Sequence, residues 1–189
     1  MNVLKPFILK LFCLALCVGC ASLRPAVEAP ADFEVRGKAG VVEGEESFSA
    51  RFVWRQYGSA FTIDLWGPLG QGRVRLDGDE RRLAILDGKG AVISEGPHGE
   101  VMRAHLGWSL PLDVLPSWVL GKPGEGSGAA GRQYDGDGRL VAFEQLSWSV
   151  AYARHNEVQT ARGPRWLPGR ITAIRGDYRV RLSISDWVL

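Results

Sequence analysis

Few residues of this 189-residue chain stand at spacings that would support catalysis. His98, His105 and His155 form no metal-ligand pattern with one another, with cysteine or with carboxylates. No serine lies in a G-x-S-x-G turn, and the acidic residues are spread over turns and exposed strand faces. Residues 126–131 match G-x-G-x-x-G, but they follow a predicted helix rather than a strand, so we interpret them as a loop. The sequence therefore predicts neither an enzyme nor a metal or cofactor site.

Cys20 is the residue whose position predicts a covalent modification. Residues 1–19 join Lys5 and Lys10 to an apolar run too short to span a bilayer permanently, which is typical of a secretion signal. The stretch Leu16-Cys17-Val18-Gly19-Cys20 that follows resembles the bacterial lipobox, whose cysteine is acylated before and after cleavage, with Cys17 where that pattern prefers leucine. The alternative is an ordinary signal peptide with an incidental cysteine. We expect residues 1–19 to be a lipoprotein signal peptide.

The mature chain would then be a lipid-anchored protein with one folded domain. Residues 20–32 contain two prolines, several alanines and no apolar periodicity, so they form an acylated tether, and the domain spans residues 33–189. By resemblance to Gram-negative sorting rules, Ala21 after the cysteine favours the outer membrane, with the domain facing the periplasm. Several acyl chains make such an anchor stable. No intrachain disulfide is possible, since Cys20 is the only cysteine after residue 19.

Length and charge limit the classes of partner. The 170 residues after the signal carry 21 basic and 21 acidic residues, so their formal net charge is zero. This balance does not favour a nucleic-acid partner. The length is sufficient for one domain with its own core, and we expect a monomer.

Most of the domain is predicted to be antiparallel β-sheet, because apolar and polar residues alternate along it. The alternation runs through residues 48–54, 61–65, 74–76, 140–152 and 178–184. Glycine-containing turns at 57–59, 77–79 and 87–90 separate neighbouring strands, as hairpins require. The strands therefore form a meander with one apolar face.

Residues 98–120 break the alternation. Their apolar residues recur every three or four positions, which is helical spacing, and Pro111 and Pro116 divide the segment into two short helices. A single sheet must cover its apolar face, so we expect the helices to lie across its concave side. The predicted fold is mainly β, an unclosed half-barrel of antiparallel strands with a short helical lid. A closed barrel or a β-sandwich fits the strands but gives the helices no place.

The loop after residue 65 holds an apolar residue at its tip. In Trp66-Gly67-Pro68-Leu69-Gly70, the leucine lies between proline and glycine and should point away from the sheet. The residues alone leave two hypotheses open. Leu69 either inserts into a membrane or folds back onto Trp66.

Several segments resemble the LolB family of outer-membrane lipoproteins. They are residues 33–38, 52–56, 65–72, 107–112, 115–124, 145–148 and 186–187. The resemblance covers the chain from about residue 33 to the end, although the sequence lacks the amphipathic helix that follows the tether in longer members. It implies the LolA/LolB-like half-barrel fold. It also implies the partners: the periplasmic carrier LolA, acylated client lipoproteins and the phospholipid of the outer membrane.

The resemblance further implies an apolar cavity that receives the acyl chains of the client. The residues expected to line it are Phe48, Phe52, Trp54, Phe61, Ile63, Leu65, Val74, Leu76, Met102, Leu106, Leu115, Trp118, Leu146, Trp148 and Val150. The loop of Trp66, Gly67, Pro68, Leu69 and Gly70 matches the protruding membrane-insertion loop of the family. Close packing of the same side chains into a solid core is the alternative at each position. A lipocalin-like binder of a small apolar ligand and a structural outer-membrane lipoprotein are the other functional hypotheses.

Overall fold

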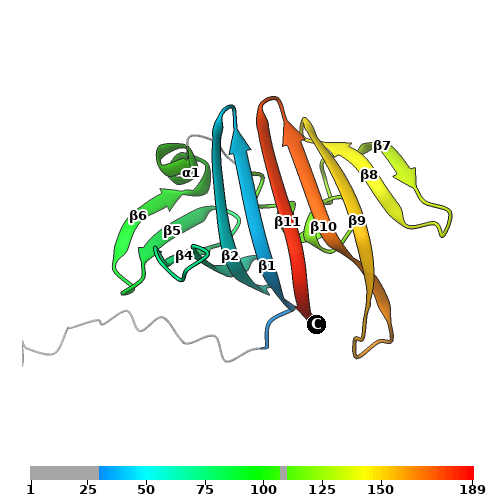
Figure 1. Cartoon of the computed structure of the whole chain (residues 1–189), viewed down its shortest axis with the longest axis horizontal. Coiled ribbons are helices and arrows are strands. Elements are labelled where there is room, and N and C mark those ends of the chain that lie inside the picture. Colours follow the sequence, from blue (N-terminus) through cyan, green and yellow to red (C-terminus); the bar gives the residue numbers. More distant parts are fainter. Residues whose placement is uncertain (1–29, 107–109) are drawn as a thin grey trace, which may run out of the picture. The chain divides into compact units, whose positions relative to one another are not determined.

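One antiparallel sheet of eleven strands organises residues Ala31–Leu189, which form a compact unit (Figure 1). The computed structural model describes residues 30–106 and 110–189. The strands are β1 (Phe33–Glu43), β2 (Glu46–Tyr57), β3 (Ala60–Trp66), β4 (Val74–Gly78), β5 (Arg82–Asp87), β6 (Val92–Pro97), β7 (Ala130–Tyr134), β8 (Leu140–Gln145), β9 (Trp148–Val158), β10 (Arg165–Arg175) and β11 (Tyr178–Val188). The helices are α1 (His98–Leu106) and α2 (Leu115–Val119).

Two meanders meet at a seam in the middle of the sheet. The strand order is β6-β5-β4-β3-β2-β1-β11-β10-β9-β8-β7, so the first strand of the chain pairs with the last. The register of this seam shifts between Arg36 and Gly37, where a side chain at position 37 would overlap the carbonyl oxygen of Ser183. The edge strands β6 and β7 do not pair with each other, which confirms the predicted unclosed sheet.

Each strand has an inner apolar face and an outer polar face. In β2, Ala50, Phe52, Trp54 and Gln56 are buried at every second position, as the period of a strand requires. The pairing of β2 with β1 and β3 carries this face across the sheet, because Val35, Trp54 and Ile63 lie in one row. The side chains between them, such as Arg55, lie on the outer face.

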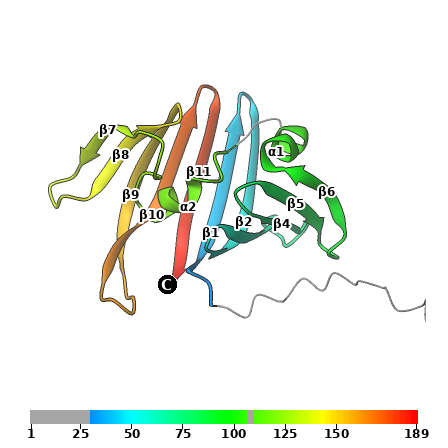
Figure 2. The same ribbon diagram turned by 180° about the vertical axis from the view of Figure 1, so that it is seen from behind.

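The two helices lie on the inner face, α1 beside the edge strands β5 and β6 and α2 in front of β10 and β11, nearer the middle of the sheet (Figure 2). Helix α1 packs against β5 and β6, and its buried residues Val101 and Met102 join the core. Helix α2 packs on the other meander, where the Trp118 ring contacts Phe143 and Trp148. The prediction of two short helices on the concave side is confirmed. Within the described residues, neither helix has the length and apolar character needed to cross a bilayer.

One predicted strand is wrong. Residues 140–152 form the two strands β8 and β9, joined by a tight turn in which Leu146 and Ser147 have φ angles of 51° and 63°. No glycine or asparagine signals this turn. The hairpin pairs Gln145 with Trp148, so Phe143 and Gln145 face inward in β8 instead of Ala142 and Leu146.

Candidate functional site

The inner face holds a packed apolar core beneath each helix. Of the residues expected to line a cavity, Phe52, Trp54, Phe61, Met102, Leu115, Trp118, Trp148 and Val150 are buried, and Ile63, Leu65, Val74 and Leu76 are partly buried against them. The ring centroid of Trp118 lies 6.1 Å from the ring centroid of Phe143 and 6.4 Å from that of Trp148, which is contact distance for aromatic pairs. These side chains therefore fill one another in the state that the structure describes.

Two expected lining residues are placed differently, and the side chain of a third, Leu106, lies outside the described residues. Leu146 lies in the β8–β9 turn and is 44% exposed, so its assignment to the interior is wrong. Phe48 has the inward phase of β2 but is 57% exposed, because it lies in the part of the strand that no helix covers. Leu106 is the last residue of α1, and its side chain lies outside the described residues.

Beside the buried Val35, Phe52 and Trp54, another part of the inner face between the helices is apolar but only partly covered. We call this region the central inner face; it consists of Ala39, Val41, Ile63, Leu65, Val74, Leu76, Leu182 and Ile184. These side chains come from β1, β3, β4 and β11, and β1, β3 and β4 lie between the strands that contact α1 and the strands behind α2. Phe48 continues the region beside Val41, its partner in the register. The sheet thus presents an apolar surface that is only partly covered.

Polar contacts fix α2 to the sheet. The side-chain oxygen of Gln145 accepts hydrogen bonds from Trp118 Nε1 at 2.8 Å and from the Gly124 amide at 2.9 Å. Its side-chain nitrogen donates to the carbonyl oxygens of Gly124 and Ser127. The buried hydroxyl of Tyr152 donates to the Trp118 carbonyl oxygen at 2.8 Å. Burial raises the pKa of this phenol, so Tyr152 remains a hydrogen-bond donor at neutral pH.

The loop between β3 and β4 holds Leu69 away from the protein. The Gly67 carbonyl oxygen accepts a hydrogen bond from the Gly70 amide at 2.9 Å, which places Pro68 and Leu69 at the corner of a tight turn. The Gly67 amide donates to the Gln71 carbonyl oxygen at 2.8 Å and closes the base of the loop. Leu69 is 85% exposed. Its side chain therefore does not fold back onto Trp66.

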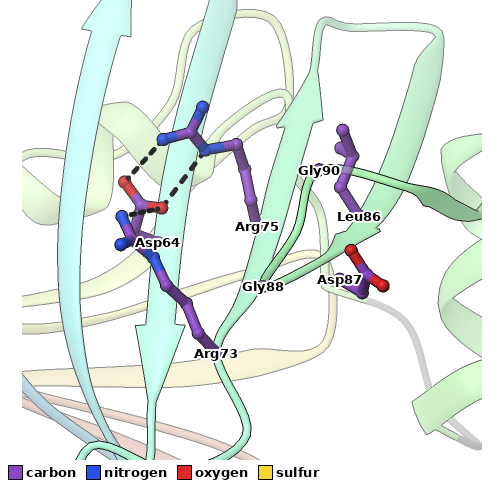
Figure 3. Close-up of a pocket in the computed structure, with 7 residues that line it drawn as sticks. All are labelled: Asp64, Arg73, Arg75, Leu86, Asp87, Gly88 and Gly90. Carbon is purple, nitrogen blue, oxygen red and sulfur yellow. Dashed lines mark hydrogen bonds and ion pairs between the residues drawn. The ribbon is translucent and has the colours of Figure 1, made fainter.

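A buried carboxylate at the base of this loop binds three arginines on the outer face, two of which, Arg73 and Arg75, are drawn in Figure 3. Asp64 is 3% exposed, and its Oδ1 lies 3.0 Å from Arg73 Nη2 and 3.2 Å from Arg75 Nε. Its Oδ2 lies 3.5 Å from Arg55 Nη1. Asp64, Arg73 and Arg75 also line an open hollow of about 200 Å³ with Asp87 of the neighbouring turn.

The charge of Asp64 is maintained by these contacts. Burial alone would raise the pKa of the carboxyl group, but the hydrogen bonds and positive charges of Arg75 and Arg73 outweigh it, so the pKa is lowered. A carboxylate held in this way keeps the arginine side chains in defined positions. The second hollow, about 250 Å³, also lies on the outer side, over β7 to β10.

Sequence reasoning missed Gln145 and misplaced Asp64. Asp64 was expected among solvated residues, but it is buried because arginines of β2 and β4 cover it. The alternating Arg73 and Arg75 beside it were the available signal. The sequence holds no comparable signal for Gln145, because the face of the sheet on which it lies depends on the unexpected turn after it. The described residues contain no cluster of three potential metal ligands.

This open sheet with helices on its inner face has the fold of the LolA superfamily. It is similar to the crystal structure of the LolA superfamily protein NE2245 from Nitrosomonas europaea, with a TM-score of 0.55 and 10% sequence identity over 85% of this chain and 86% of that one. At this identity the likeness shows the fold alone.

The sequence comparisons are more specific. The family model for the outer membrane lipoprotein LolB matches residues 31–187. The chain is 31% identical over 182 residues to the outer-membrane lipoprotein LolB of Halorhodospira halophila, covering 89% of this chain and 88% of that protein. It is 33% identical over 193 residues to the LolB of Pseudomonas aeruginosa, covering 92% and 91%. The chain belongs to the LolB family of outer-membrane lipoproteins.

Proposed function

We propose that this protein receives acylated lipoproteins from the periplasmic carrier LolA and inserts them into the outer membrane. The observation that carries the proposal is the central inner face, an apolar surface that is only partly covered. Family membership supports it, since LolB proteins act in lipoprotein trafficking. A small-ligand binder and a purely structural lipoprotein are not favoured by the family match.

An acyl chain gains enough from this surface to be held. Burying one CH₂ group stabilises binding by about 0.8 kcal/mol, so a chain of about 14 buried methylenes gains about 11 kcal/mol. Such a client does not dissociate into water at a useful rate. Its chains must pass from one apolar surface to another and then into lipid. The free-energy change of this exchange is close to zero. Transfer therefore needs only a slightly more favourable free energy for the chains in lipid, and no catalytic step.

Full enclosure of an acyl chain requires the lid to move. The core cluster is closed, and the residues of the central inner face are partly buried against it. We place the acyl chain along the central inner face, where it would displace α1, whose buried residues are Val101 and Met102. Phe48, exposed at the uncovered part of β2, would contact the part of the chain nearest solvent.

The N-terminal segment would hold the domain at its target membrane. Residues 1–19 act as a lipoprotein signal peptide, Cys20 carries the acyl chains, and residues 20–32 form the tether of the domain that begins at Phe33. The domain faces the periplasm and acts as a monomer. These assignments rest on the lipobox-like sequence and on the outer-membrane lipoproteins of the family.

Leu69 would enter the bilayer during delivery. Its exposure at the corner of a closed turn supports this role, and Trp66 at the base of the loop suits the headgroup level. A buried leucine gains only about 1.5–3 kcal/mol, which perturbs lipid locally but does not anchor a protein. The loop therefore opens a path for the client chains.

Leu69→Asp tests this role in a transfer assay. The chain lacking residues 1–20 is mixed with LolA that carries a triacylated lipoprotein, and then with phospholipid vesicles. We expect the variant to capture client as well as the unchanged chain does but to deliver at least tenfold less, because a carboxylate does not enter the acyl region.

Leu146→Asp is the matched control, since Leu146 is also an exposed leucine in a tight turn. It should capture and deliver normally. Equal delivery by Leu69→Asp would refute the role of the loop. Failure of the unchanged chain to take any client from LolA would refute the proposed function itself.

A further inference from the structure

Two basic side chains face each other on the outer face next to the Leu69 loop. Lys38 of β1 and Arg51 of β2 are direct partners in the register, and Arg51 is in turn the partner of Trp66, the last residue of β3. Both basic side chains are exposed. Like charges directly opposed across two strands are destabilising. Among the described residues, neither has a carboxylate within ion-pair distance, so the fold tolerates an unbalanced pair at this position.

Arg73 comes directly before β4 and extends this positive region, since Val74 pairs with Leu65, the residue before Trp66. The Arg73 side chain is 56% exposed, and one of its nitrogens, Nη2, is bound to Asp64. That contact fixes the guanidinium group and leaves its other N–H groups facing outward. We call Lys38, Arg51 and Arg73 the basic strip. It crosses the sheet at the level where the Leu69 loop leaves β3.

The acidic groups of this region do not balance its basic groups. Asp64 is shared by three arginines, and Glu34 pairs with Arg36 and Arg55. The Asp87 carboxylate accepts hydrogen bonds from the Lys89 and Ala91 amides of its own turn, at 2.8 and 2.9 Å. The basic strip therefore keeps a net positive charge directly beside an apolar loop tip.

We propose that the basic strip binds the phosphate groups of phospholipid headgroups in the bilayer that Leu69 enters. Arginine and lysine are the side chains that recognise phosphate, and arginine offers several N–H donors to one group. The neighbouring residues favour a membrane over an acidic protein surface, because Leu69 is 85% exposed and Trp66 stands in the same row. This inference rests on the proposed insertion of Leu69 and assigns the outer face of β1 to β4 to the membrane.

The binding would orient the protein during delivery. With phosphates on the basic strip and Leu69 below the headgroups, the outer face of this meander lies along the bilayer. Each basic residue near an anionic membrane surface strengthens binding about fivefold, and salt weakens the attraction. The basic strip would thus determine how often the loop is inserted. Leu69 would determine how the inserted loop perturbs the lipid.

The test uses the mature acylated protein in vesicles. Gln71→Cys introduces a thiol in the exposed loop, and it is the only free thiol once Cys20 is acylated and Cys13 and Cys17 are removed with the signal. An environment-sensitive fluorophore on this thiol reports contact of the loop with lipid. Vesicles of phosphatidylcholine alone are compared with vesicles of phosphatidylcholine that contain about one third phosphatidylglycerol, at low and high salt.

We expect the labelled protein to show more loop insertion in anionic vesicles, and less of it at high salt. Arg51→Gln should reduce the inserted fraction about fivefold, and Arg51→Gln with Arg73→Gln by more than tenfold. Arg51 has no ion pair among the described residues, so its single variant tests the strip without disturbing the Asp64 cluster. Arg132→Gln with Arg165→Gln changes the net charge equally at exposed positions on β7 and β10 and should have no effect.

Three results would overturn the proposal. Equal insertion of the Arg51→Gln variant and the unchanged protein would remove the strip from membrane binding. Normal insertion combined with impaired capture from LolA would assign the strip to an acidic protein surface. If the loop contacts lipid in no vesicle, and Leu69→Asp behaves like the unchanged protein, the insertion role in the proposed function fails as well.

Discussion

The two helices are held on the same sheet by different means. In α2, Trp118 and Val119 are completely buried, and Trp118 is hydrogen-bonded through its ring to Gln145 and through its carbonyl to Tyr152. In α1, Val101 and Met102 provide the buried contacts. Within the part of the chain that the structure describes, no side-chain hydrogen bond joins α1 to the sheet. The difference indicates a fixed lid over one meander and a more weakly held lid over the other.

This difference indicates where the protein opens. Regions with few buried apolar contacts open locally at a lower free energy than the rest of a domain. We therefore expect α1 to leave the sheet before α2 does, exposing β5 and β6 and widening the central inner face. The proposed uptake of the acyl chain and the proposed insertion of Leu69 into the membrane would then both occur on the β1–β6 meander.

The largest expected effect comes from removing the ring that fixes α2. Trp118→Ala should lower the free energy of unfolding by about 3–5 kcal/mol, because it leaves a cavity and frees Gln145. Met102→Ala, the matched truncation in α1, should cost about 2 kcal/mol. Urea unfolding of the two variants measures both values. A larger loss for Met102→Ala would reverse the assignment of fixed and weakly held lids.

A smaller effect is expected from the polar contacts of α2 alone. Gln145→Met keeps the volume but leaves the Trp118 ring nitrogen and the Gly124 amide without their acceptor, at a cost of about 2–3 kcal/mol. Hydrogen exchange should become faster in α2 and stay unchanged in α1. Tyr152→Phe, which removes one hydrogen bond, should show the same pattern at about 1 kcal/mol. Faster exchange in α1 would show that the helices are not independent.

The smallest effect concerns the outer face of the β1–β6 meander in acid. Because the folded-state pKa of Asp64 is lowered, its ion pairs add stability above the unfolded-state pKa of about 4, and this contribution is lost as the pH falls through the folded-state pKa. Unfolding measured from pH 6 to pH 2 should therefore show a shallower acid decline for Asp64→Asn than for the unchanged protein. Asp113→Asn, at an exposed position, is the control. An identical decline in both variants would show that Asp64 is not responsible.

The sequence was sufficient for the outline of the fold. Alternating apolar residues predicted β2, β3, β4 and β11, and the helical spacing with two prolines predicted α1 and α2. Strands without clear alternation were missed. In β5, apolar Leu83, Ala84, Ile85 and Leu86 follow one another, and β10 contains Pro168 and Gly169. The β8–β9 turn was missed because Leu146 and Ser147 carry no turn signal.

The site was less accessible to sequence reasoning. The position of Leu69 in a turn could be predicted, since proline and glycine around it define the turn locally, but the residues alone left open whether it folds back onto Trp66. The Asp64 cluster and the Lys38–Arg51 pair depend on which strands are neighbours and in what register, and a single sequence does not give that register. The same limit applies to the extent of the central inner face, because coverage by a helix is a tertiary property.

The seam between β1 and β11 has a consequence for biosynthesis. The strand that leaves the ribosome first must wait for the strand that leaves last, since Glu34 pairs with Val188 and Glu43 with Tyr178. Pairing of residues so far apart in the chain is slow, whereas the hairpins within each meander form from local contacts. The two meanders should therefore assemble separately, and the sheet should be completed only after export of the whole polypeptide.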